Sequence, residues 1–398
     1  MTDLSGLRTL YISYNGMGEP LVRSQVLNYQ ERLTAMGLSA DLLTFEKISP
    51  ENEAAIRAEL AAHGIQWSWL PYNGHRCAKG SLRDVAAGMR EILKRRGRID
   101  FVHARSFIPA LMAYTAKLRG GPDYLYDVRG FFAHEKRYKG RIKSDAQFRV
   151  VRWLEGRLYK GASAIVTLTA AAMRVIERDY LGANPDLPRA VIPTCVDLSR
   201  YEGPRRPLDP EAPRLVYSGS LGAGYLPDEV FRFFAVVRDT LPKATLEILT
   251  RSDASIAAQS AAKAGLTQAD YTLRSLTPAE MPAALKDCDA ALSLIAPDFS
   301  KIASCPTKMA EYLAAGLVVV ANGEMIGDVG EQLRTTGAGI TIDEFGPEAI
   351  SNAAGQMIAM LHNDRQLCRA QSAAADLFSL ASGVEQYAAL YSSFRARF

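Results

Sequence analysis

The chain has 398 residues, of which 48% are hydrophobic and 23% charged, and its formal net charge is +4. These values are typical of a soluble globular protein, exclude an intrinsically disordered one, and leave room for two domains. So small a net charge gives no indication of a nucleic-acid partner, and no apolar run reaches the length of a membrane span. Because the first residues lack the apolar core of a signal sequence, we expect a cytoplasmic protein.

Short apolar runs alternate with amphipathic stretches such as 24–36 and 82–96 in the first half of the chain. The strand-like runs there are Thr9–Tyr14, Ala40–Thr44, Phe101–His103, Tyr124–Val128, Ala164–Leu168 and Ala190–Ile192. The second series of such runs is Leu215–Ser218, Thr245–Leu249, Tyr271–Leu273, Ala290–Ile295, Val318–Ala321 and Ile340–Ile342. Two successive series of strand–helix alternation predict two Rossmann-like α/β domains, each with a doubly wound parallel sheet.

Four prolines stand within residues 200–213, between the two series. Proline cannot continue a helix or a central strand, so this stretch is predicted to be a linker. We therefore place the first domain at residues 1–199 and the second at 214–382. The remaining stretch, 383–398, is predicted to be a helix.

A glycine-bearing loop follows the first strand of each predicted domain. In the first domain the glycines are Gly16 and Gly18. The corresponding residues of the second domain are Ser218, Gly219, Ser220 and Gly222. Because glycine lets the backbone approach a ligand closely, we expect both loops to contact substrate, with plain tight turns as the alternative. The second loop has the spacing G-x-x-G-x-G, which is not the dinucleotide fingerprint and argues against NAD.

Polar side chains stand at the carboxyl ends of predicted strands, where parallel sheets bind their ligands. Arg129 offers a bidentate cation, and Asp127, two residues earlier, is placed to orient it; a structural Asp–Arg pair is the alternative. His103 ends the preceding strand, although a lone histidine there is more often structural than catalytic. Arg251 ends a predicted strand of the second domain. We expect it to contact a phosphate of the ligand, with a solvated arginine as the alternative.

Charge is distributed unevenly along the chain. Residues 1–200 carry a net charge of +10 and the remainder −6. Within 129–160 there are ten Lys or Arg and three acids, with aromatic residues between them. This segment is predicted to contact an anionic membrane surface or an anionic glycan. The alternative is a solvated helix whose apolar face packs on the sheet.

The most informative stretch is a polar loop followed by a predicted helix. The loop residues are Ser304, Cys305, Pro306 and Thr307. The two hydroxyls either contact a ligand or cap the helix, and Lys308 and Glu311 lie on one face of it. A helix N-terminus with a cation, a carboxylate and hydroxyls suits a nucleotide diphosphate and its ribose. The alternative is a capped surface helix with an ordinary salt bridge.

The sequence P-T-K-x-x-E-Y-L-A-A-G at 306–316 resembles the signature of family-4 retaining glycosyltransferases of the GT-B class. Segments 11–27, 191–197 and 217–225 also resemble segments of that family, in the same order. The resemblance implies a GT-B fold, in which two Rossmann-like domains face an interdomain cleft. The first domain would bind the acceptor and the second the donor, and helix 383–398 would pack back on the first domain.

The resemblance also implies roles for individual residues. Glu311 matches the family glutamate that holds the ribose, whereas the glutamate eight positions earlier is replaced by Ala303, so the usual donor sugars cannot be carried over. Lys308, Arg251 and the backbone amides of Gly219–Gly222 would hold the diphosphate, and Arg129 or His103 would face the sugar. The family generally needs no divalent ion or other cofactor, so the D-x-D sequence at 287–289 is not interpreted as a metal site.

We therefore predict a retaining glycosyltransferase that moves a sugar from a UDP- or GDP-type donor to a glycan or lipid-linked acceptor. Its place would be cell-surface polysaccharide or glycoconjugate biosynthesis, at the inner face of the membrane. Two alternatives stay open. One is a sugar-nucleotide epimerase of the same fold. The other is a non-catalytic nucleotide-sugar-binding subunit, an alternative that is left open because Ala303 replaces the first glutamate of the family signature.

Overall fold

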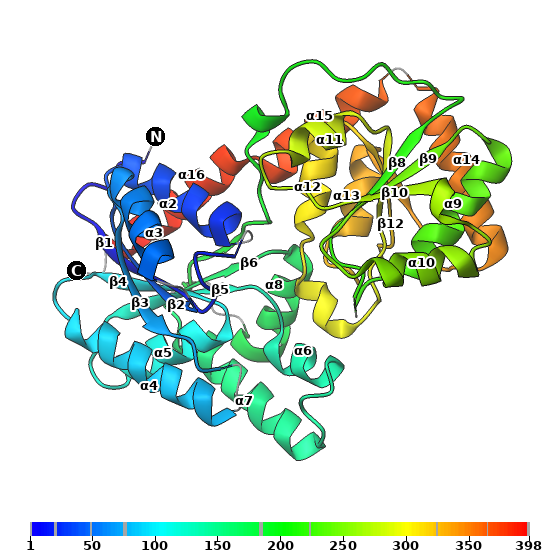
Figure 1. Ribbon diagram of the computed structural model, residues 1–398. Coiled ribbons are helices and arrows are strands. Elements are labelled where there is room, and N and C mark those ends of the chain that lie inside the picture. The colour runs from blue at the N-terminus through cyan, green and yellow to red at the C-terminus, as the bar shows by residue number, and fades with distance from the viewer. Residues whose placement is uncertain are drawn as a thin grey trace. The chain divides into compact units, whose positions relative to one another are not determined.

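The computed structural model describes residues 2–19, 22–47, 50–74, 78–182, 186–222, 224–323, 325–363 and 365–395. The chain forms two compact units, Met1–Pro193 with Ala381–Phe398, and Thr194–Leu380. Each unit is built around a parallel β-sheet with helices on both faces (Figure 1). Within the described residues, no helix combines the length and the hydropathy needed to cross a bilayer.

The sheet of the first unit has seven parallel strands in the order β3-β2-β1-β4-β5-β6-β7. The strands are β1 (Arg8–Ser13), β2 (Ser39–Glu46), β3 (Gln66–Pro71), β4 (Phe101–Arg105), β5 (Asp123–Val128), β6 (Ala164–Thr167) and β7 (Arg189–Val191). The order reverses between β1 and β4, and ligands of open α/β sheets bind at such a reversal, beyond the carboxyl ends of the strands.

Helices cover both faces of this sheet (Figure 1). They are η1 (Arg23–Leu27), α2 (Asn28–Ala35), α3 (Pro50–Ala62), α4 (Ala78–Lys94), α5 (Phe107–Lys117), α6 (Phe132–Tyr138), α7 (Asp145–Gly161), α8 (Ala170–Ile176), η2 (Glu177–Leu181) and α16 (Leu380–Arg395). In Figure 1, α2, α3 and α16 lie on one face, and α4, α5 and α7 on the other. Burial on both faces explains why the strands read as continuous apolar runs.

The helix α16 packs on the first unit through aromatic side chains. Phe394 stacks on Phe101 of β4 with ring centres 4.3 Å apart, and Tyr391 meets the same ring edge-on at 4.9 Å. The last three residues of the predicted helix, 396–398, lie outside the described part of the chain.

The sheet of the second unit has six parallel strands in the order β10-β9-β8-β11-β12-β13. They are β8 (Arg214–Ser218), β9 (Thr245–Leu249), β10 (Tyr271–Arg274), β11 (Ala290–Ser293), β12 (Val318–Ala321) and β13 (Gly339–Thr341). One face packs on α9 (Pro227–Thr240), α10 (Ala254–Lys263) and α14 (Pro347–Leu361). The other packs on α11 (Met281–Lys286), α12 (Thr307–Ala314), α13 (Val329–Thr336) and α15 (Gln366–Phe378). Three short turns complete the unit: η3 (Leu198–Tyr201), η4 (Gln268–Asp270) and η5 (Phe299–Ala303).

The fold class predicted from the sequence is confirmed, and two local features differ from the prediction. Strand β3 was not predicted, because Gln66 and Ser68 break the apolar pattern and Pro71 ends it, as is typical of an edge strand. The predicted helix 24–36 begins as the π-helical turn η1 and becomes α-helical only at Asn28.

The proline-rich stretch 200–213 is held against the second unit by two arginines. Arg205 donates to the carbonyl oxygens of Gly316, at 3.0 Å, and of Cys288. Arg206 binds the carboxylate of Asp289, which also accepts the N–H of Arg214 at 2.9 Å. These contacts fix the stretch beside the amino ends of β8 and β11.

Candidate functional site

The N-terminus of α12 is open. Pro306 occupies the cap position with φ −65° and ψ 122°, and among the described residues no side chain is seen to cap the first turn. The alternative in which Ser304 or Thr307 caps this helix is therefore wrong. Proline has no side-chain acceptor to offer, so the positive end of the helix is left for a ligand.

Lys308 lies in an aromatic cage at this helix end. Its side chain is 8% exposed, and among the described residues its Nζ has no hydrogen-bond partner. The Nζ lies 4.1 Å from the centre of the Tyr217 ring and 4.9 Å from that of Tyr225. Burial lowers the pKa of Lys308 to about 7, although Glu311 opposes the shift. A cation held by ring faces instead of a carboxylate is ready to bind an anion.

Glu311 lies one turn further along α12 and is half-buried. Burial raises its pKa to about 7, against the opposing charges of Arg200 and Lys308. Within the described part of the chain, no ion pair joins Glu311 to Lys308. The alternative of a surface helix with an ordinary salt bridge is therefore wrong, and the carboxylate is left for another donor.

The glycine loop after β8 comes close to Lys308. Gly219 has φ +119°, and a Cβ at this position would lie 3.2 Å from the Lys308 Nζ. Only glycine fits, because a side chain would meet the ammonium in a backbone conformation that L-residues avoid. The N–H of Gly219 donates to the carbonyl of Leu249 at 2.9 Å, so it is already engaged.

The serines of this loop are also engaged. The hydroxyl of Tyr312, from α12, lies 2.7 Å from the Ser218 nitrogen and 3.0 Å from its Oγ. The N–H of Gly222 donates to Ser220 Oγ at 3.1 Å. The loop is thus closed on itself and fixed to α12, so that its shape rather than its free amides defines the site.

Two further predicted residues flank this helix end. The carbonyl oxygen of Cys305 accepts from Thr194 Oγ1 at 2.9 Å, which anchors the loop before α12. Arg251 is exposed just after β9, next to Ser252, whose Oγ accepts from the glycine loop at Leu221 N at 3.0 Å. Arg251 therefore stands at the edge of the loop that carries Gly219.

In the first unit, Asp127 is the centre of a buried polar cluster. Its Oδ2 accepts from Arg129 Nη2 at 2.7 Å and Nε at 3.0 Å, and lies 3.1 Å from His103 Nε2. Burial alone would raise the pKa of Asp127, but Arg129 and His103 hold it well below its usual value. Arg129 also donates to the Tyr387 hydroxyl at 3.2 Å, and its side chain is 10% exposed. Asp127 therefore orients Arg129.

His103 itself is buried. Its Nδ1 lies 2.5 Å from the hydroxyl of Tyr391, and its other ring nitrogen is engaged by Asp127. Burial lowers the pKa of His103, although Asp127 opposes the shift. Because both ring nitrogens are hydrogen-bonded within the protein, the neutral imidazole positions Asp127 and has no free nitrogen for a substrate.

The backbone next to this cluster is strained. Ser106, directly after β4, has φ +74° and ψ 177°, a conformation almost confined to glycine. Its N–H donates to the carbonyl of Asp127 at 2.8 Å. The side chain of Arg105 is buried beside it, and its Nε has no partner among the described residues. Strain of this kind concentrates at functional sites.

The glycine loop after β1 is fixed by a buried carboxylate. Glu46 Oε1 accepts from the Met17 N–H at 2.6 Å, and a Cβ on Gly16 would lie 2.2 Å from Glu46 Oε2. A Cβ on Gly18, by contrast, would have nothing within 4 Å. Both glycines line a cavity of about 390 Å³ with the rings of Tyr14 and Tyr72. Close packing against Glu46 therefore explains the glycine at position 16, whereas the glycine at position 18 leaves the cavity open.

Known proteins are similar to this chain in sequence over one domain and in structure over almost its whole length. Residues 22–195 match the model of the glycosyl transferase 4-like domain. The whole chain superposes on a glycosyltransferase from Rickettsia africae with a TM-score of 0.71 and 14% identity, covering 98% of each chain. It is also similar to sucrose-phosphate synthase from Thermosynechococcus elongatus, with a TM-score of 0.72, 14% identity and coverage of 98% and 100%. Among curated proteins, no sequence match was found.

The chain has the GT-B fold, and its residues 22–195 match a glycosyl transferase 4-like domain. A third similar structure is that of the Anabaena protein HepE in complex with UDP-glucose, with a TM-score of 0.68, 14% identity and coverage of 97% and 100%. At such identities the solved structures show the fold alone, and the sequence similarity to the glycosyl transferase 4-like domain extends over residues 22–195.

For this glycosyltransferase, sequence reasoning missed several residues around Lys308 and Glu311. Tyr217 and Tyr225 are the two ends of segment 217–225 and were not predicted to have a role, yet their rings form the cage around Lys308. Arg200 was assigned to the linker, yet its charge acts on Glu311. Aromatic residues at both ends of a glycine loop are a signal for such a cage, whereas nothing near Arg200 in the sequence points to Glu311.

Of the two acids in the D-x-D sequence, Asp289 is engaged in structural contacts, whereas the side chain of Asp287 is exposed. Asp289 is 2% exposed, and its carboxylate binds Arg206 and lies 3.4 Å from Arg205. Among the described residues, no group of three or more His, Cys, Asp or Glu is arranged to hold a metal ion. The Asp289 carboxylate therefore fixes the proline-rich stretch.

Proposed function

We propose that this glycosyltransferase moves a sugar, with retention of configuration, from a UDP- or GDP-type donor to a glycan or lipid-linked acceptor. The observation that carries the proposal is the open N-terminus of α12 with a caged Lys308 and a half-buried Glu311. One helix turn thus presents a cation and a carboxylate on the same side. The cation suits the diphosphate of a nucleoside diphosphate, and the carboxylate suits its ribose hydroxyls.

In this proposal the donor lies on the second unit. The diphosphate binds the amides at the start of α12 and the ammonium of Lys308, and Arg251 joins from the next strand. The carboxylate of Glu311 accepts the ribose hydroxyls. As the bond from the anomeric carbon to the phosphate breaks, negative charge grows on the diphosphate, and these fixed positive groups stabilise it.

The acceptor hydroxyl attacks the anomeric carbon from the side that the diphosphate leaves, and its proton passes to a departing phosphate oxygen. The protein then needs no general base of its own and no metal ion. Arg129 is proposed to contact the sugar from the first unit, since it alone of its cluster reaches the surface. His103 and Asp127 position it.

The acceptor is proposed to bind the first unit, at the cavity of about 390 Å³ that Gly16 and Gly18 line. Its walls combine the tyrosine rings with the carboxylates of Glu19 and Glu46, side chains suited to sugar faces and hydroxyls. We place the enzyme at the cytoplasmic face of the membrane, in cell-surface polysaccharide or glycoconjugate synthesis, because the basic segment 129–160 suits an anionic surface.

Ala303 favours a second candidate, a nucleotide-sugar-binding subunit without activity. This residue is 1% exposed and has no carboxylate to offer a donor sugar. Incubation with sugar nucleotides and an acceptor, followed by NMR of the anomeric proton, separates the possibilities. A product with the donor's anomeric configuration supports the proposal, and an inverted product contradicts it. Conversion of the donor alone into its epimer would indicate the epimerase, and binding without turnover the inactive subunit.

A further inference from the structure

The outer face of α7 combines cations with large exposed apolar side chains. At helical spacing it presents Ala146, Arg149, Val150, Trp153, Arg157 and Lys160. Trp153 is 65% exposed and Val150 63%. No acid belongs to this stripe, although Asp145 and Glu155 lie on the same helix; Asp145 pairs with Arg137 at 2.7 Å. A solvated helix face rarely exposes a tryptophan, so the stripe points to something that covers it.

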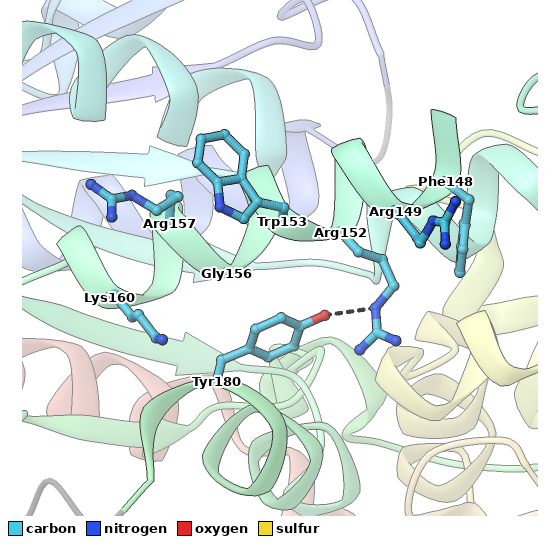
Figure 2. Close-up of a pocket in the computed structure, with 8 residues that line it drawn as sticks. All are labelled: Phe148, Arg149, Arg152, Trp153, Gly156, Arg157, Lys160 and Tyr180. Carbon is cyan, nitrogen blue, oxygen red and sulfur yellow. Dashed lines mark hydrogen bonds between the residues drawn. The ribbon is translucent and has the colours of Figure 1, made fainter. Parts of the chain in front are cut away.

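A groove runs along this face between α7 and η2 (Figure 2). Its volume is about 410 Å³, and the rings of Phe148, Trp153 and Tyr180 form part of its wall. Arg152 donates to the Tyr180 hydroxyl at 2.9 Å and lies 5.5 Å from the centre of that ring. Arg157 lies 6.0 Å from the centre of the Trp153 ring. Two guanidinium groups are thus held over aromatic faces at the groove.

The positive charge of this face is poorly compensated. Asp179 reaches Arg152 at 3.5 Å, but in the described part of the chain no carboxylate pairs with Arg149, Arg157 or Lys160. Glu155 points inward and accepts backbone hydrogen bonds, and burial raises its pKa to about 8, so it adds little negative charge at neutral pH.

The face continues beyond the first groove. Arg157 and Lys160 also line a second groove of about 590 Å³, together with Leu118 and Asp186. Leu118 is 65% exposed. The two grooves therefore share two cations, and each has a large apolar side chain exposed at its edge.

We propose that the α7 face is a docking surface for an anionic phospholipid bilayer, with lipid phosphates at the grooves and Trp153, Val150 and Leu118 at the acyl boundary. Unpaired cations match the charge of the lipid headgroups, and exposed apolar side chains match the layer beneath them. A nucleic acid or an anionic glycan would use the cations but would leave the aliphatic side chains in water. The proposal deepens the proposed function, because a lipid-linked acceptor would be met at such a surface.

The test is flotation with vesicles of phosphatidylcholine, with and without phosphatidylglycerol. The full chain is expected to float only with the anionic vesicles. In the triple variant Arg149→Gln, Arg157→Gln, Lys160→Gln, the partition constant should fall about a hundredfold, since each basic residue near the surface contributes about fivefold. The matched control, Lys243→Gln, Arg365→Gln, Arg369→Gln, removes the same charge from exposed positions of the second unit and should bind normally. Equal losses in both variants, or no binding by the wild type, would overturn the proposal.

A second measurement tests the apolar part of the surface. Brominated lipids should quench the tryptophan fluorescence of the wild type, and Trp153→Phe should remove most of the quenching, since Trp67 is buried and Trp69 is partly buried on β3, outside the α7 face. Two results together would instead assign the face to an anionic glycan. Heparin would compete with the vesicles for the protein, and Trp153→Phe would leave vesicle binding unchanged. Nucleotide binding by the triple variant and flotation by Glu311→Ala are measured separately. Failure of the docking surface is thereby distinguished from failure of the proposed function.

Discussion

The Nζ of Lys308 lies 4.1 Å from the centre of the Tyr217 ring, and among the described residues it has no hydrogen-bond partner. A buried cation without a counter-ion destabilises the ligand-free protein. The ring faces offset part of that cost while leaving the ammonium available. This arrangement is typical of a binding site whose strongest partner arrives with the substrate, and it leads to the following predictions.

The substitution Lys308→Met should raise the melting temperature of the ligand-free protein and weaken nucleotide binding. Methionine fills the same space without the buried charge, so the fold gains stability. A charge-assisted hydrogen bond contributes about 1.5–3 kcal/mol, so affinity for a nucleoside diphosphate should fall roughly tenfold to a hundredfold. Thermal unfolding and calorimetric titration measure the two effects. Lys243→Met, at an exposed position, is the control and should change neither. A lower melting temperature for Lys308→Met would contradict this account of the cage.

Nucleotide binding should be accompanied by proton uptake above neutral pH and by proton release below it. Burial brings the pKa of Lys308 down to about 7 and that of Glu311 up to about 7. At about pH 8, Lys308 is mostly neutral, and a diphosphate draws a proton onto it. At about pH 6, Glu311 is mostly protonated, and ribose hydroxyls favour its ionised form, so a proton is released. Calorimetry in buffers of different ionisation enthalpy measures the exchange. Uptake at the higher pH should vanish in Lys308→Met, and its persistence there would assign the proton to another group.

The buried His103 should make the protein sensitive to acid. Its pKa is lower in the folded chain than the ordinary value of 6.5, so the unfolded chain binds the extra proton. The free energy of unfolding should therefore fall as pH drops below about 6.5, by at most about 1.4 kcal/mol per pH unit for one group. His103→Gln should flatten this dependence in urea unfolding. His362→Gln, at an exposed position, should keep it. The same slope in His103→Gln and the wild type would show that another group is responsible.

The two glycines of the first loop should respond differently to alanine. In Gly16→Ala the new Cβ would lie 2.2 Å from Glu46 Oε2, which cannot withdraw easily because the same carboxylate binds Met17. Overpacking of this kind destabilises by about 1–3 kcal/mol, so the melting temperature should drop. Gly18→Ala should leave stability unchanged, because nothing lies within 4 Å of the new atom. Equal effects on stability would mean that Glu46 does not fix the loop.

Periodicity was sufficient to predict the two parallel sheets, because strands covered on both faces must be apolar throughout. The positions of Lys308 and Glu311 on one helix face also follow from their spacing. The cage around Lys308 and the burial of His103 could not be predicted, since they depend on how distant segments pack. Tyr391 is far from His103 in the sequence, yet its hydroxyl occupies the histidine's Nδ1.

The central claim is that α12 holds a nucleoside diphosphate, with its ribose on Glu311. Thermal unfolding with UDP, GDP, CMP and ADP, on the wild type and on Glu311→Ala, tests it most directly. A ligand at a hundred times its dissociation constant stabilises by about 2.7 kcal/mol, enough for a clear shift in melting temperature. The account predicts a shift with UDP or GDP that is lost or much reduced in Glu311→Ala. No shift with any nucleotide, or an equal shift in the variant, would contradict it.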